Sequence, residues 1–382
     1  MSERKLVTIR TIAELLPIEG ADNIEVARVD GWKVVVKKGE FEVGDKCVFY
    51  EIDSFLPANA PQYEFLRKNG IKNAPDGCER IRLKTVKLRG QLSQGLALPI
   101  GAFPENQIAF WDADRTGNAL DSVLNVTKYD PDDGCWTLMA AKSAGRFPEF
   151  IPRTDEERIQ NIYAEYAQKY KNVEFRPSIK LDGCSITIAA IKEKERFIDV
   201  KKLNDGNIPY PYAWPDMQII VCLRNLILKH DPTSAFWKAV ERKNENGKSL
   251  IDCLRTCRYG EVWQGELMGP GIQGNKEKLL QNEVFIFRIF DPDLQVFWDD
   301  GVFQFEMEIS KEYGVKPVPQ LPICKPFADY ATLDELLAAS NIPSMNAPVA
   351  EGIVYKSVEK IDGETIHFKV INNQFLLNEG RS

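Results

Sequence analysis

The sequence lacks a hydrophobic run long enough to cross a membrane. Its apolar runs, such as Val284 to Phe287, have the length of a β-strand, far below the roughly 20 residues that a membrane-spanning helix needs. The first residues contain no apolar segment typical of a secretory signal. The eight cysteines include no Cys-x-x-Cys pair. We therefore expect reduced, mostly buried thiols, a cytoplasmic or otherwise intracellular location and no contact with membranes.

An excess of positive charge is also absent. The 382 residues include 49 Lys and Arg against 56 Asp and Glu, a net charge of −7 at pH 7. This balance excludes a basic coat over the whole surface, but it leaves room for a local basic patch. With 44% hydrophobic and 27% charged residues, the composition is that of ordinary globular domains, which excludes disorder, collagen-like repeats and a coiled coil. The length predicts two or three domains.

Short strands dominate the first hundred residues. Runs of β-branched and aromatic residues, such as 24–29 and 32–36, are separated by turns that contain glycine. Roughly five such strands in a segment of this length predict a small β-barrel, most commonly an OB-fold. From residue 173 onward, strand and helix patterns mix without a regular βαβ alternation. This pattern predicts an α+β domain with antiparallel sheets.

A segment with glycine and proline separates the two regions. We expect an OB-type domain over residues 1–140, a linker over 141–155 and a second domain over 156–382. Thr154 and Glu157 have the spacing of a capping box, which predicts the start of a helix there. The expected helices of the second domain cover 155–170, 233–245, 302–313 and 332–340, and its expected strands cover 185–191, 218–223, 261–267, 284–290, 352–358 and 364–371.

Five basic residues and no acidic ones occur between positions 80 and 89. Arg80, Arg82 and Lys84 are spaced as residues on one face of a strand are. After a slip in phase at 85–86, which a β-bulge would allow, Lys87 and Arg89 resume the alternation. Such a basic strip can follow a phosphate backbone. A solvated edge strand that uses charge to prevent aggregation explains the same pattern equally well.

The tetrapeptide Lys-x-Asp-Gly occurs twice, beginning at Lys180 and at Lys360. Lys360 lies between two strand-like runs, so Asp362 and Gly363 are typical of a hairpin turn. Too few residues follow it to build a pocket. Lys180 precedes a strand and most of the second domain. We therefore predict that Lys180 carries the chemistry and that the second match is a turn.

A lysine in this setting can attack the α-phosphorus of a nucleotide and form a lysyl phosphoramidate. The amine must be neutral, so the site must lower its pKa from an ordinary value of about 10.4. A divalent cation and cationic neighbours would do so. The site then needs carboxylates for the metal, cations for the phosphates and an aromatic ring for the base. The sequence supplies these after Lys180, in the order Arg224, Glu266, Phe287, Glu351-Gly352 and Lys369.

This ordered set resembles the motifs of the covalent nucleotidyltransferase superfamily of polynucleotide ligases and RNA capping enzymes. The matches are Lys180-x-Asp182-Gly183 to motif I, Arg224 to motif Ia, Glu266 to motif III, Phe287 to motif IIIa, Glu351-Gly352 to motif IV and Lys369 to motif V. The sequence is most similar to ATP-dependent RNA ligases with an OB domain at the amino end, and segments 87–95, 153–161, 264–275 and 368–373 look typical of them. The resemblance covers nearly the whole chain.

Domain order supports the same choice, because DNA ligases and capping enzymes place their OB domain after motif V, where this chain has few residues. One departure is His367, since relatives often have a second basic residue two positions before Lys369. The resemblance implies an α+β fold. An N-terminal OB-type β-barrel would be followed by an adenylyltransferase (ATP-grasp-like nucleotidyltransferase) domain of antiparallel sheets with flanking helices.

The resemblance also implies a reaction and the residues for it. Lys180 would attack ATP, AMP would move to an RNA 5′-phosphate, and an RNA 3′-hydroxyl would then displace AMP. Asp182, Glu266 and Glu351 would converge on Mg²⁺ or Mn²⁺ through its waters, with Glu266 as an alternative holder of the ribose. The other expected nucleotide contacts are Phe287 on one face of adenine, Ile353 or Val354 on its other face, and Arg224 and Lys369 on the ribose or phosphates.

The expected partner is RNA, as a nicked duplex or as broken ends, and the basic residues Arg80, Arg82, Lys84, Lys87 and Arg89 would bind its backbone. We expect a monomer that acts in RNA repair. Two alternatives remain open at this point. The protein could transfer nucleotides to another acceptor, as a DNA-joining or RNA-capping enzyme does. It could also be a non-catalytic RNA-binding OB protein, although that leaves Lys180 and the ordered carboxylates unexplained.

Overall fold

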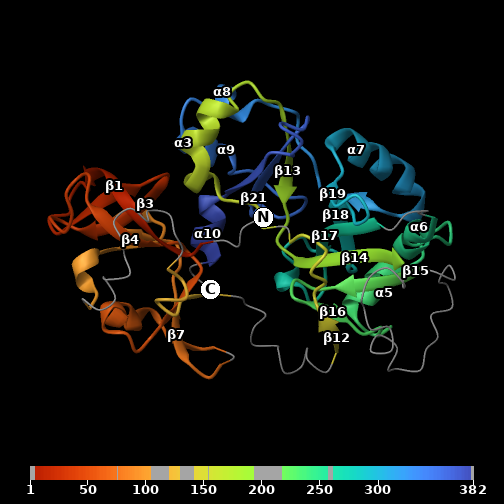
Figure 1. The fold of residues 1–382 in the computed structure, drawn as a ribbon, viewed down its shortest axis with the longest axis horizontal. Coiled ribbons are helices and arrows are strands. Elements are labelled where there is room, and N and C mark those ends of the chain that lie inside the picture. Colours follow the sequence, from red (N-terminus) through yellow and green to blue (C-terminus); the bar gives the residue numbers. More distant parts are fainter. Residues whose placement is uncertain are drawn as a thin grey trace. The chain divides into compact units, whose positions relative to one another are not determined.

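The computed structural model describes residues 5–74, 76–104, 120–129, 142–153, 155–192, 217–256 and 261–379. Their contacts divide the chain into two compact units. The amino-terminal unit comprises the described residues up to 129, together with 157–169 and 373–379. The carboxy-terminal unit comprises the described residues of 142–156 and 170–372. Figure 1 shows the strands and helices of both units, coloured along the sequence.

The amino-terminal unit is built mainly from strands. These are β1 (Val7–Pro17), β2 (Ile24–Val29), β3 (Trp32–Lys37), β4 (Lys46–Tyr50), β5 (Ser54–Pro57), β6 (Lys72–Asn73), β7 (Glu79–Arg82), β8 (Val86–Leu88), β9 (Gln91–Ser93), β10 (Leu96–Pro99) and β11 (Thr127–Lys128). They form a sheet β10-β4-β1-β2-β3, a sheet β11-β5-β7-β6 and a hairpin β8-β9. Its helical segments are η1 (Pro61–Asn69), η2 (Ile100–Ala102), α3 (Ile159–Lys169) and α10 (Asn373–Glu379).

Strand β4 is buried on both faces, which explains its nearly continuous apolar sequence. Cys47 and Phe49 point into one apolar cluster, which also contains Trp32. Val48 and Tyr50 alternate with them and point into a second cluster on the opposite face. Removal of apolar surface from water contributes about 25 cal/mol per Å². The five-stranded sheet is therefore stabilised from both sides.

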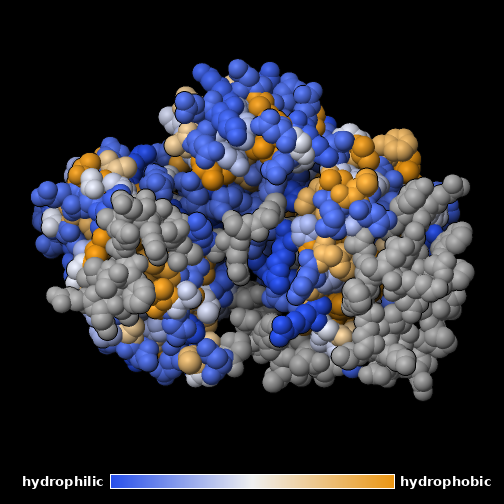
Figure 2. Space-filling view, in the orientation of Figure 1, coloured by the Kyte–Doolittle hydropathy of each residue, from blue (hydrophilic) through white to orange (hydrophobic). Residues whose placement is uncertain are grey.

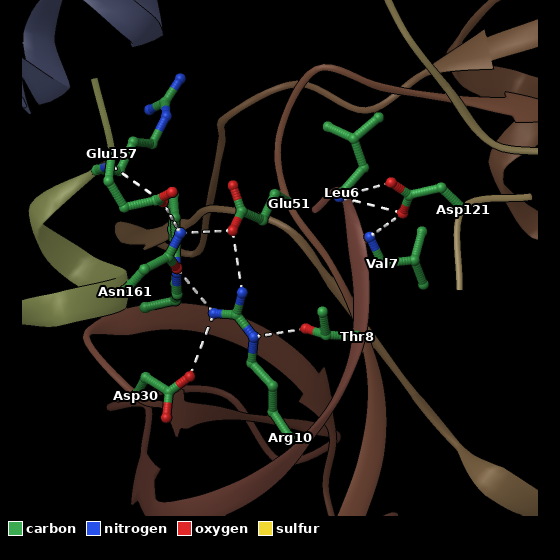
Figure 3. Close-up of polar contacts among 11 residues, drawn as sticks. Leu6, Val7, Thr8, Arg10, Asp30, Glu51, Asp121, Glu157 and Asn161 are labelled. Atoms are coloured by element: carbon green, nitrogen blue, oxygen red, sulfur yellow. Dashed lines mark hydrogen bonds and ion pairs between the residues drawn. The ribbon is translucent and has the colours of Figure 1, made fainter. Parts of the chain in front are cut away.

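A buried polar network attaches α3 to the strands of the amino-terminal unit (Figure 3). The Arg10 guanidinium donates to Glu51 Oε1 at 2.9 Å and to Asn161 Oδ1 at 2.9 Å, and it forms an ion pair with Asp30 at 3.2 Å. Asn161, which lies on α3, also donates to Glu51 Oε1 at 2.7 Å and accepts from the Trp32 indole N–H at 2.6 Å. Helix α3 therefore belongs to the amino-terminal unit although it follows the linker in sequence.

Helix α10 also contributes to the amino-terminal unit. Leu376 packs against the apolar cluster that contains Trp32. Gln94 Nε2 donates to Asn373 Oδ1 at 3.1 Å at the start of the helix. The unit thus combines three separate stretches of the sequence.

The carboxy-terminal unit has two sheets, whose strands are antiparallel except for one short parallel pair. Its strands are β12 (Ser143–Arg146), β13 (Phe175–Lys180), β14 (Cys184–Lys192), β15 (Met217–Cys222), β16 (Leu226–Leu228), β17 (Glu261–Met268), β18 (Glu283–Asp291), β19 (Val296–Phe297), β20 (Lys316–Pro317), β21 (Gly352–Ser357) and β22 (His367–Ile371). The large sheet has the order β12-β16-β15-β14-β17-β18-β19, with β20 beside β18, and the small sheet has the order β13-β21-β22. The helical segments are α5 (Ala235–Glu241), α6 (Leu250–Thr256), η4 (Gln273–Asn275), α7 (Asp300–Ile309), η5 (Ser310–Tyr313), α8 (Pro326–Asp329) and α9 (Leu333–Ala339).

The large sheet is covered on both faces, as the alternation along β14 requires. Ile186 and Ile188 point into a cluster with side chains of α5, α6 and α7. Ala189 and Ile191 point to the opposite face, where Phe147 packs against them. Helix α7 keeps an apolar stripe exposed, formed by Val302, Phe305 and Ile309, and apolar residues gather over this helix in Figure 2. In the part of the chain that the structure describes, no helix is long and apolar enough to span a membrane.

The small sheet separates polar from apolar side chains. Because paired residues share a face, the register places Lys180, Val354 and Lys369 on one face. Ile353 and Phe368 lie on the opposite face. Phe368 is fully buried there and packs against other aromatic rings. The small sheet therefore presents one reactive face and buries the other.

The helices and strands expected in the second part of the sequence all form, with ends shifted by a few residues. The expectation of one bulged strand from 80 to 88 is wrong. Strand β7 ends at Arg82, and β8 begins at Val86 in a separate hairpin. The expected cap residue Thr154 lies outside the described residues. The sequence also assigned 156–382 to one domain, whereas the contacts group 157–169 and 373–379 with the amino-terminal unit.

Candidate active site

Lys180 is the last residue of β13, and its amine meets a carboxylate that immediately precedes β21. Its Nζ donates to Glu351 Oε2 at 2.6 Å. Pairing of Lys180 with Gly352 across the two strands sets this approach. The side chains of Lys180 and Glu351 are 28% and 19% exposed, so the pair is largely shielded but can still be reached from solvent.

Asp182 and Glu266 bring two further carboxylates toward the same lysine. Glu266 lies on β17 and accepts a hydrogen bond from the Gly183 N–H at 3.1 Å. Asp182 pairs with the Lys276 amine at 2.5 Å. The expected set of Lys180 with Asp182, Glu266 and Glu351 is therefore brought together in one place.

Two glycines allow these elements to approach so closely. A Cβ added to Gly183 would lie 2.4 Å from the carbonyl oxygen of Leu267 and 2.9 Å from Cγ of Glu266. A Cβ added to Gly352 would lie 2.3 Å from the carbonyl oxygen of Val370. Neither distance is possible for a real side chain, so both positions require glycine. The Glu-Gly pair at 351–352 is thus a packing requirement at the site and not a simple turn.

The three carboxylates give the site an excess of negative charge. Burial, opposed by the Lys180 ammonium and reinforced by Glu351, raises the pKa of Glu266 to about 8. Burial and Glu351 also raise the pKa of Asp182, despite its pairing with Lys276. Carboxylates hold a proton in this way when cations are too few to balance them. This set of hard oxygen donors fits Mg²⁺ or Mn²⁺.

The pKa of Lys180 itself is raised. Burial alone would lower it, but the carboxylates of Glu351 and Glu266 outweigh that effect. The amino acids alone therefore favour the ammonium form, which cannot act as a nucleophile. A cation placed among the carboxylates would reverse this balance. Within the described ranges, no three His, Cys, Asp or Glu side chains are close enough to hold a metal directly.

Phe287 occupies a β-bulge in β18. The pairing between β17 and β18 passes from Gln264–Arg288 to Gly265–Ile286 and skips Phe287. Bulges next to active sites often re-aim a side chain. The neighbouring β18 residues on both sides are buried, whereas Phe287 is only half-buried. Its ring is therefore the best-placed aromatic surface of this strand for a nucleotide base.

The expectation that Ile353 contacts the nucleotide does not fit the register of the small sheet. Ile353 is 3% exposed and lies on the face opposite to Lys180. The alternative, Val354, pairs with Lys369 and shares the face of Lys180. A one-residue step along a strand reverses the face, which the sequence alone did not resolve.

Arg224 and Lys369, the two expected nucleotide-binding cations, share a carboxylate. Arg224 forms an ion pair with Asp155 Oδ2, and the Lys369 amine lies 3.9 Å from Asp155 Oδ1. Arg224 is 44% exposed, and Lys369 is 9% exposed. Asp155 thus occupies the position between two cations where an anionic or hydroxyl group of a nucleotide would fit.

A group of buried charges beside this site was missed in the sequence. Glu156 pairs with Arg288 at 3.8 Å, and both side chains are at most 10% exposed. Burial and Arg288 lower the pKa of Lys356 to about 7 and that of His367 to about 3. The Lys356 amine donates to the Phe287 carbonyl oxygen at 2.6 Å. The sequence feature that could have revealed this group is Arg288, a charged residue in the middle of an apolar strand.

The five residues of the expected basic strip have different environments. Arg80 is 2% exposed and donates to the Asn125 carbonyl oxygen and to Asp76, so it does not belong to an exposed strip. Arg82 is half-buried and pairs with Asp53 at 2.8 Å. Lys84 is also half-buried, whereas Lys87 and Arg89 are exposed on the β8–β9 hairpin. The strip thus reduces to four side chains on separate elements.

The second Lys-x-Asp-Gly match is a turn, as predicted. Ile361 and Glu364 pair across it, and Asp362 and Gly363 both have positive φ, at 52° and 83°. Such angles are typical of a tight hairpin turn. Lys360 is exposed.

Comparison with known proteins gives consistent results for both units. Residues 6–100 match an OB-fold domain, and residues 174–371 match the RNA ligase family. No curated protein sequence matches the chain. The fold expected from the sequence, an OB-fold followed by an α+β domain of antiparallel sheets with helices, is confirmed.

Solved structures of Naegleria gruberi RNA ligase are similar over the whole chain. An apo form of a variant of that enzyme has 35% identity and a TM-score of 0.81, with 98% of both chains covered. Its complex with pyrophosphate has 35% identity and a TM-score of 0.80, again over 98% of both chains. A variant with ATP and Mn has 35% identity and a TM-score of 0.80, over 100% of this chain and 99% of that one. With a family match over its site and full-length similarity to a solved member, the chain belongs to the RNA ligase family.

Proposed function

We propose that the protein is an ATP-dependent RNA ligase that joins RNA 3′-hydroxyl and 5′-phosphate ends in RNA repair. The observation that carries this proposal is Lys180 at 2.6 Å from Glu351, with Glu266 and Asp182 around it. A related ligase of 35% identity binds ATP and Mn. A non-catalytic RNA-binding protein would have no use for a lysine with three converging carboxylates.

In the first step, Lys180 Nζ attacks the α-phosphorus of ATP. A nitrogen–phosphorus bond forms, and the bond to the bridging oxygen of the departing pyrophosphate breaks. The amine must first lose a proton, and Glu351 is the carboxylate in hydrogen-bonding distance to receive it. The protein contributes alignment and charge neutralisation to such phosphoryl transfer.

The carboxylates of Asp182, Glu266 and Glu351 are the proposed holders of Mg²⁺ or Mn²⁺. A bound divalent cation supplies positive charge that favours a neutral lysine amine and neutralises phosphate oxygens. Burial, together with the nearby Glu351 carboxylate, raises the pKa of Glu266 to about 8, and a bound cation would lower it again. Glu266 could instead hold the ribose.

The nucleotide is expected to lie along the reactive face of the small sheet. Phe287 stacks on one face of adenine and Val354 contacts the other, because both side chains are half-buried and Val354 shares the face of Lys180. Arg224 and Lys369 hold the ribose or phosphates, replacing their contact with Asp155.

The remaining two steps use RNA. A 5′-phosphate oxygen of RNA attacks the lysyl-AMP, which forms a 5′–5′ pyrophosphate linkage and releases Lys180. An RNA 3′-hydroxyl then attacks that 5′-phosphate, a phosphodiester bond forms, and AMP leaves. We propose that Arg82, Lys84, Lys87 and Arg89 bind the backbone of a nicked duplex or of broken ends. The protein would act as an intracellular monomer.

A ligation panel tests the proposal. The full-length protein with Mg²⁺ or Mn²⁺ receives labelled ATP or GTP, and the protein adduct is resolved on a denaturing gel. Nicked duplexes with RNA or DNA on each side of the break then report sealing. We expect an adduct with ATP and sealing of an RNA 3′-hydroxyl end. An adduct formed only with GTP would indicate capping, and sealing restricted to DNA would indicate a DNA-joining enzyme.

A further inference from the structure

One residue of the predicted basic strip, Arg82, converges in the amino-terminal unit with two residues outside that strip, Lys72 and Tyr129. The ring of Tyr129, which follows β11, lies beneath the guanidinium of Arg82, with 4.2 Å from Cζ to the ring centroid. The amine of Lys72, on β6, lies 4.8 Å from the same centroid and donates to the Tyr129 hydroxyl at 3.0 Å. We call these residues, Lys72, Arg82 and Tyr129, the Tyr129 platform.

The fold presents the platform away from the hydrophobic core. In the four-stranded sheet, Arg82 pairs with Phe55, and Ile81 pairs with Leu56. Ile81 and Leu56 are buried in an apolar cluster, so Arg82 and Phe55 face the other way. Phe55 packs its edge on Tyr129, with the two ring centroids 5.3 Å apart, which fixes the orientation of the tyrosine ring.

The platform gathers cations where few anions balance them. Asp53 accepts from Nε and Nη2 of Arg82, at 3.2 and 2.8 Å, but it is shared with Arg158 at 3.6 Å. Nη1 of Arg82 makes no hydrogen bond within the described part of the chain. Lys72 is exposed. Two cations held on one ring repel each other, and an anion placed between their free N–H groups would relieve that repulsion.

We propose that the Tyr129 platform is a binding site for the phosphate backbone of the RNA substrate, with Lys72 and Arg82 as the phosphate contacts and Tyr129 as the residue that positions them. The proposal rests on the RNA ligase function above and adds Lys72 and Tyr129 to the RNA interface. Phosphate groups suit the site because Arg82 offers the N–H groups of Nη1 and Lys72 offers a point charge. In a protein of net charge −7, attraction of RNA depends on such local groups.

The test measures binding of a nicked RNA duplex to the full-length protein as a function of salt, with formation of the ATP adduct as a check on folding. Lys72→Ala should weaken RNA binding several-fold and lower the salt slope by about one unit, because one phosphate contact is lost. Tyr129→Ala should have the same effect, and Tyr129→Phe, which keeps the ring, should retain part of the binding. The matched control is Lys38→Ala, an exposed lysine of the same unit, which should change neither quantity.

The outcomes separate this inference from the proposed function. If the wild-type protein neither seals nor binds nicked RNA, the RNA ligase function fails. If the wild type binds and seals but Lys72→Ala keeps the wild-type affinity and salt slope, the platform is not an RNA site. A salt slope that falls equally in Lys38→Ala would also overturn the proposal, because the effect would then reflect net charge alone.

Discussion

Each unit of this ligase contains a partly buried cation that meets carboxylates, and the two cations have very different surroundings. Arg10 of the amino-terminal unit is 11% exposed and is matched by Glu51, Asp30, Asn161 and Thr8. Lys180 of the carboxy-terminal unit makes one hydrogen bond, to Glu351, in a group of three carboxylates.

The difference separates a structural network from a reactive one. In the Arg10 network, a single side chain donates to several acceptors with good geometry, so its positive charge is matched by its neighbours. The Lys180 group is unbalanced, because burial and mutual repulsion shift the pKa values of Asp182 and Glu266 upward. Strong pKa shifts without full pairing are typical of groups that await a ligand. Charge balance, and not burial alone, therefore distinguishes the two roles.

The largest expected effect is on chemistry alone. Lys180→Ala should abolish the AMP adduct in an intact-mass measurement with ATP and Mg²⁺, since Lys180 is the proposed nucleophile and contacts Glu351, whereas Lys276 pairs with Asp182. RNA binding by the amino-terminal unit should persist. Lys360→Ala is the matched control and should form the adduct normally, because Lys360 lies in an exposed turn. The reverse pattern would move the nucleophile to Lys360.

The second largest expected effect is on the stability of the amino-terminal unit and leaves the chemistry unchanged. Arg10→Leu removes the guanidinium that pairs with the Glu51 carboxylate, whose side chain is 1% exposed. Loss of one partner of a buried pair costs about 3–5 kcal/mol, so hydrogen exchange in β1 to β4 should accelerate strongly. The folded fraction should still form the Lys180 adduct, because the network lies within the other unit.

Arg28→Ala is the control for this comparison. Arg28 pairs with Glu14, and the two side chains are 36% and 50% exposed, respectively. Such exposed ion pairs contribute at most about 1 kcal/mol to the free energy of unfolding. If Arg10→Leu destabilised the unit no more than Arg28→Ala, the network around α3 would not be what holds that helix in place.

The third effect depends on pH. Glu266 has an ordinary pKa of 4.5, which folding raises to about 8. Between these values the folded chain keeps a proton that the unfolded chain has lost, so the stability of the ligand-free protein falls as pH rises. The Glu266→Gln variant cannot ionise at this position, so it does not show this fall in stability with rising pH. The gain in melting temperature of Glu266→Gln over wild type should therefore grow from pH 5 to pH 8. A constant difference would mean that Glu266 is ionised throughout.

The smallest effect concerns Asp155. Asp155→Asn should remove the carboxylate that pairs with Arg224 and Lys369 and tighten ATP binding about two- to five-fold, because Asp155 is 40% exposed and an ion pair of a partly exposed carboxylate contributes up to about 1 kcal/mol. Calorimetric titration of ATP in a Lys180→Ala background avoids turnover. Glu174→Gln, which removes an exposed pair with Lys325, serves as the control. Weaker ATP binding by Asp155→Asn would instead make Asp155 a nucleotide contact.

The sequence predicted the fold class, which is confirmed, and it predicted the group of Lys180 and three carboxylates that the structure brings together, because both depend on local patterns and on the order of motifs. It did not predict which of Ile353 and Val354 faces Lys180, since that depends on strand register. It placed Arg80 on an exposed strip, but Arg80 is buried and donates to the carbonyl oxygens of Asn125 and Phe55, both distant in sequence. Long-range packing of this kind has no local signature, and the grouping of α3 with the amino-terminal unit is a further example.

Helix α10 has a consequence for how the protein is made. The amino-terminal unit uses Leu376 and Asn373, near the end of the chain, to complete its packing. Ribosomes add roughly 5–20 residues per second, so the first strands wait on the order of 10–50 s for this last helix. A chain broken during synthesis would lack it and expose part of the cluster around Trp32.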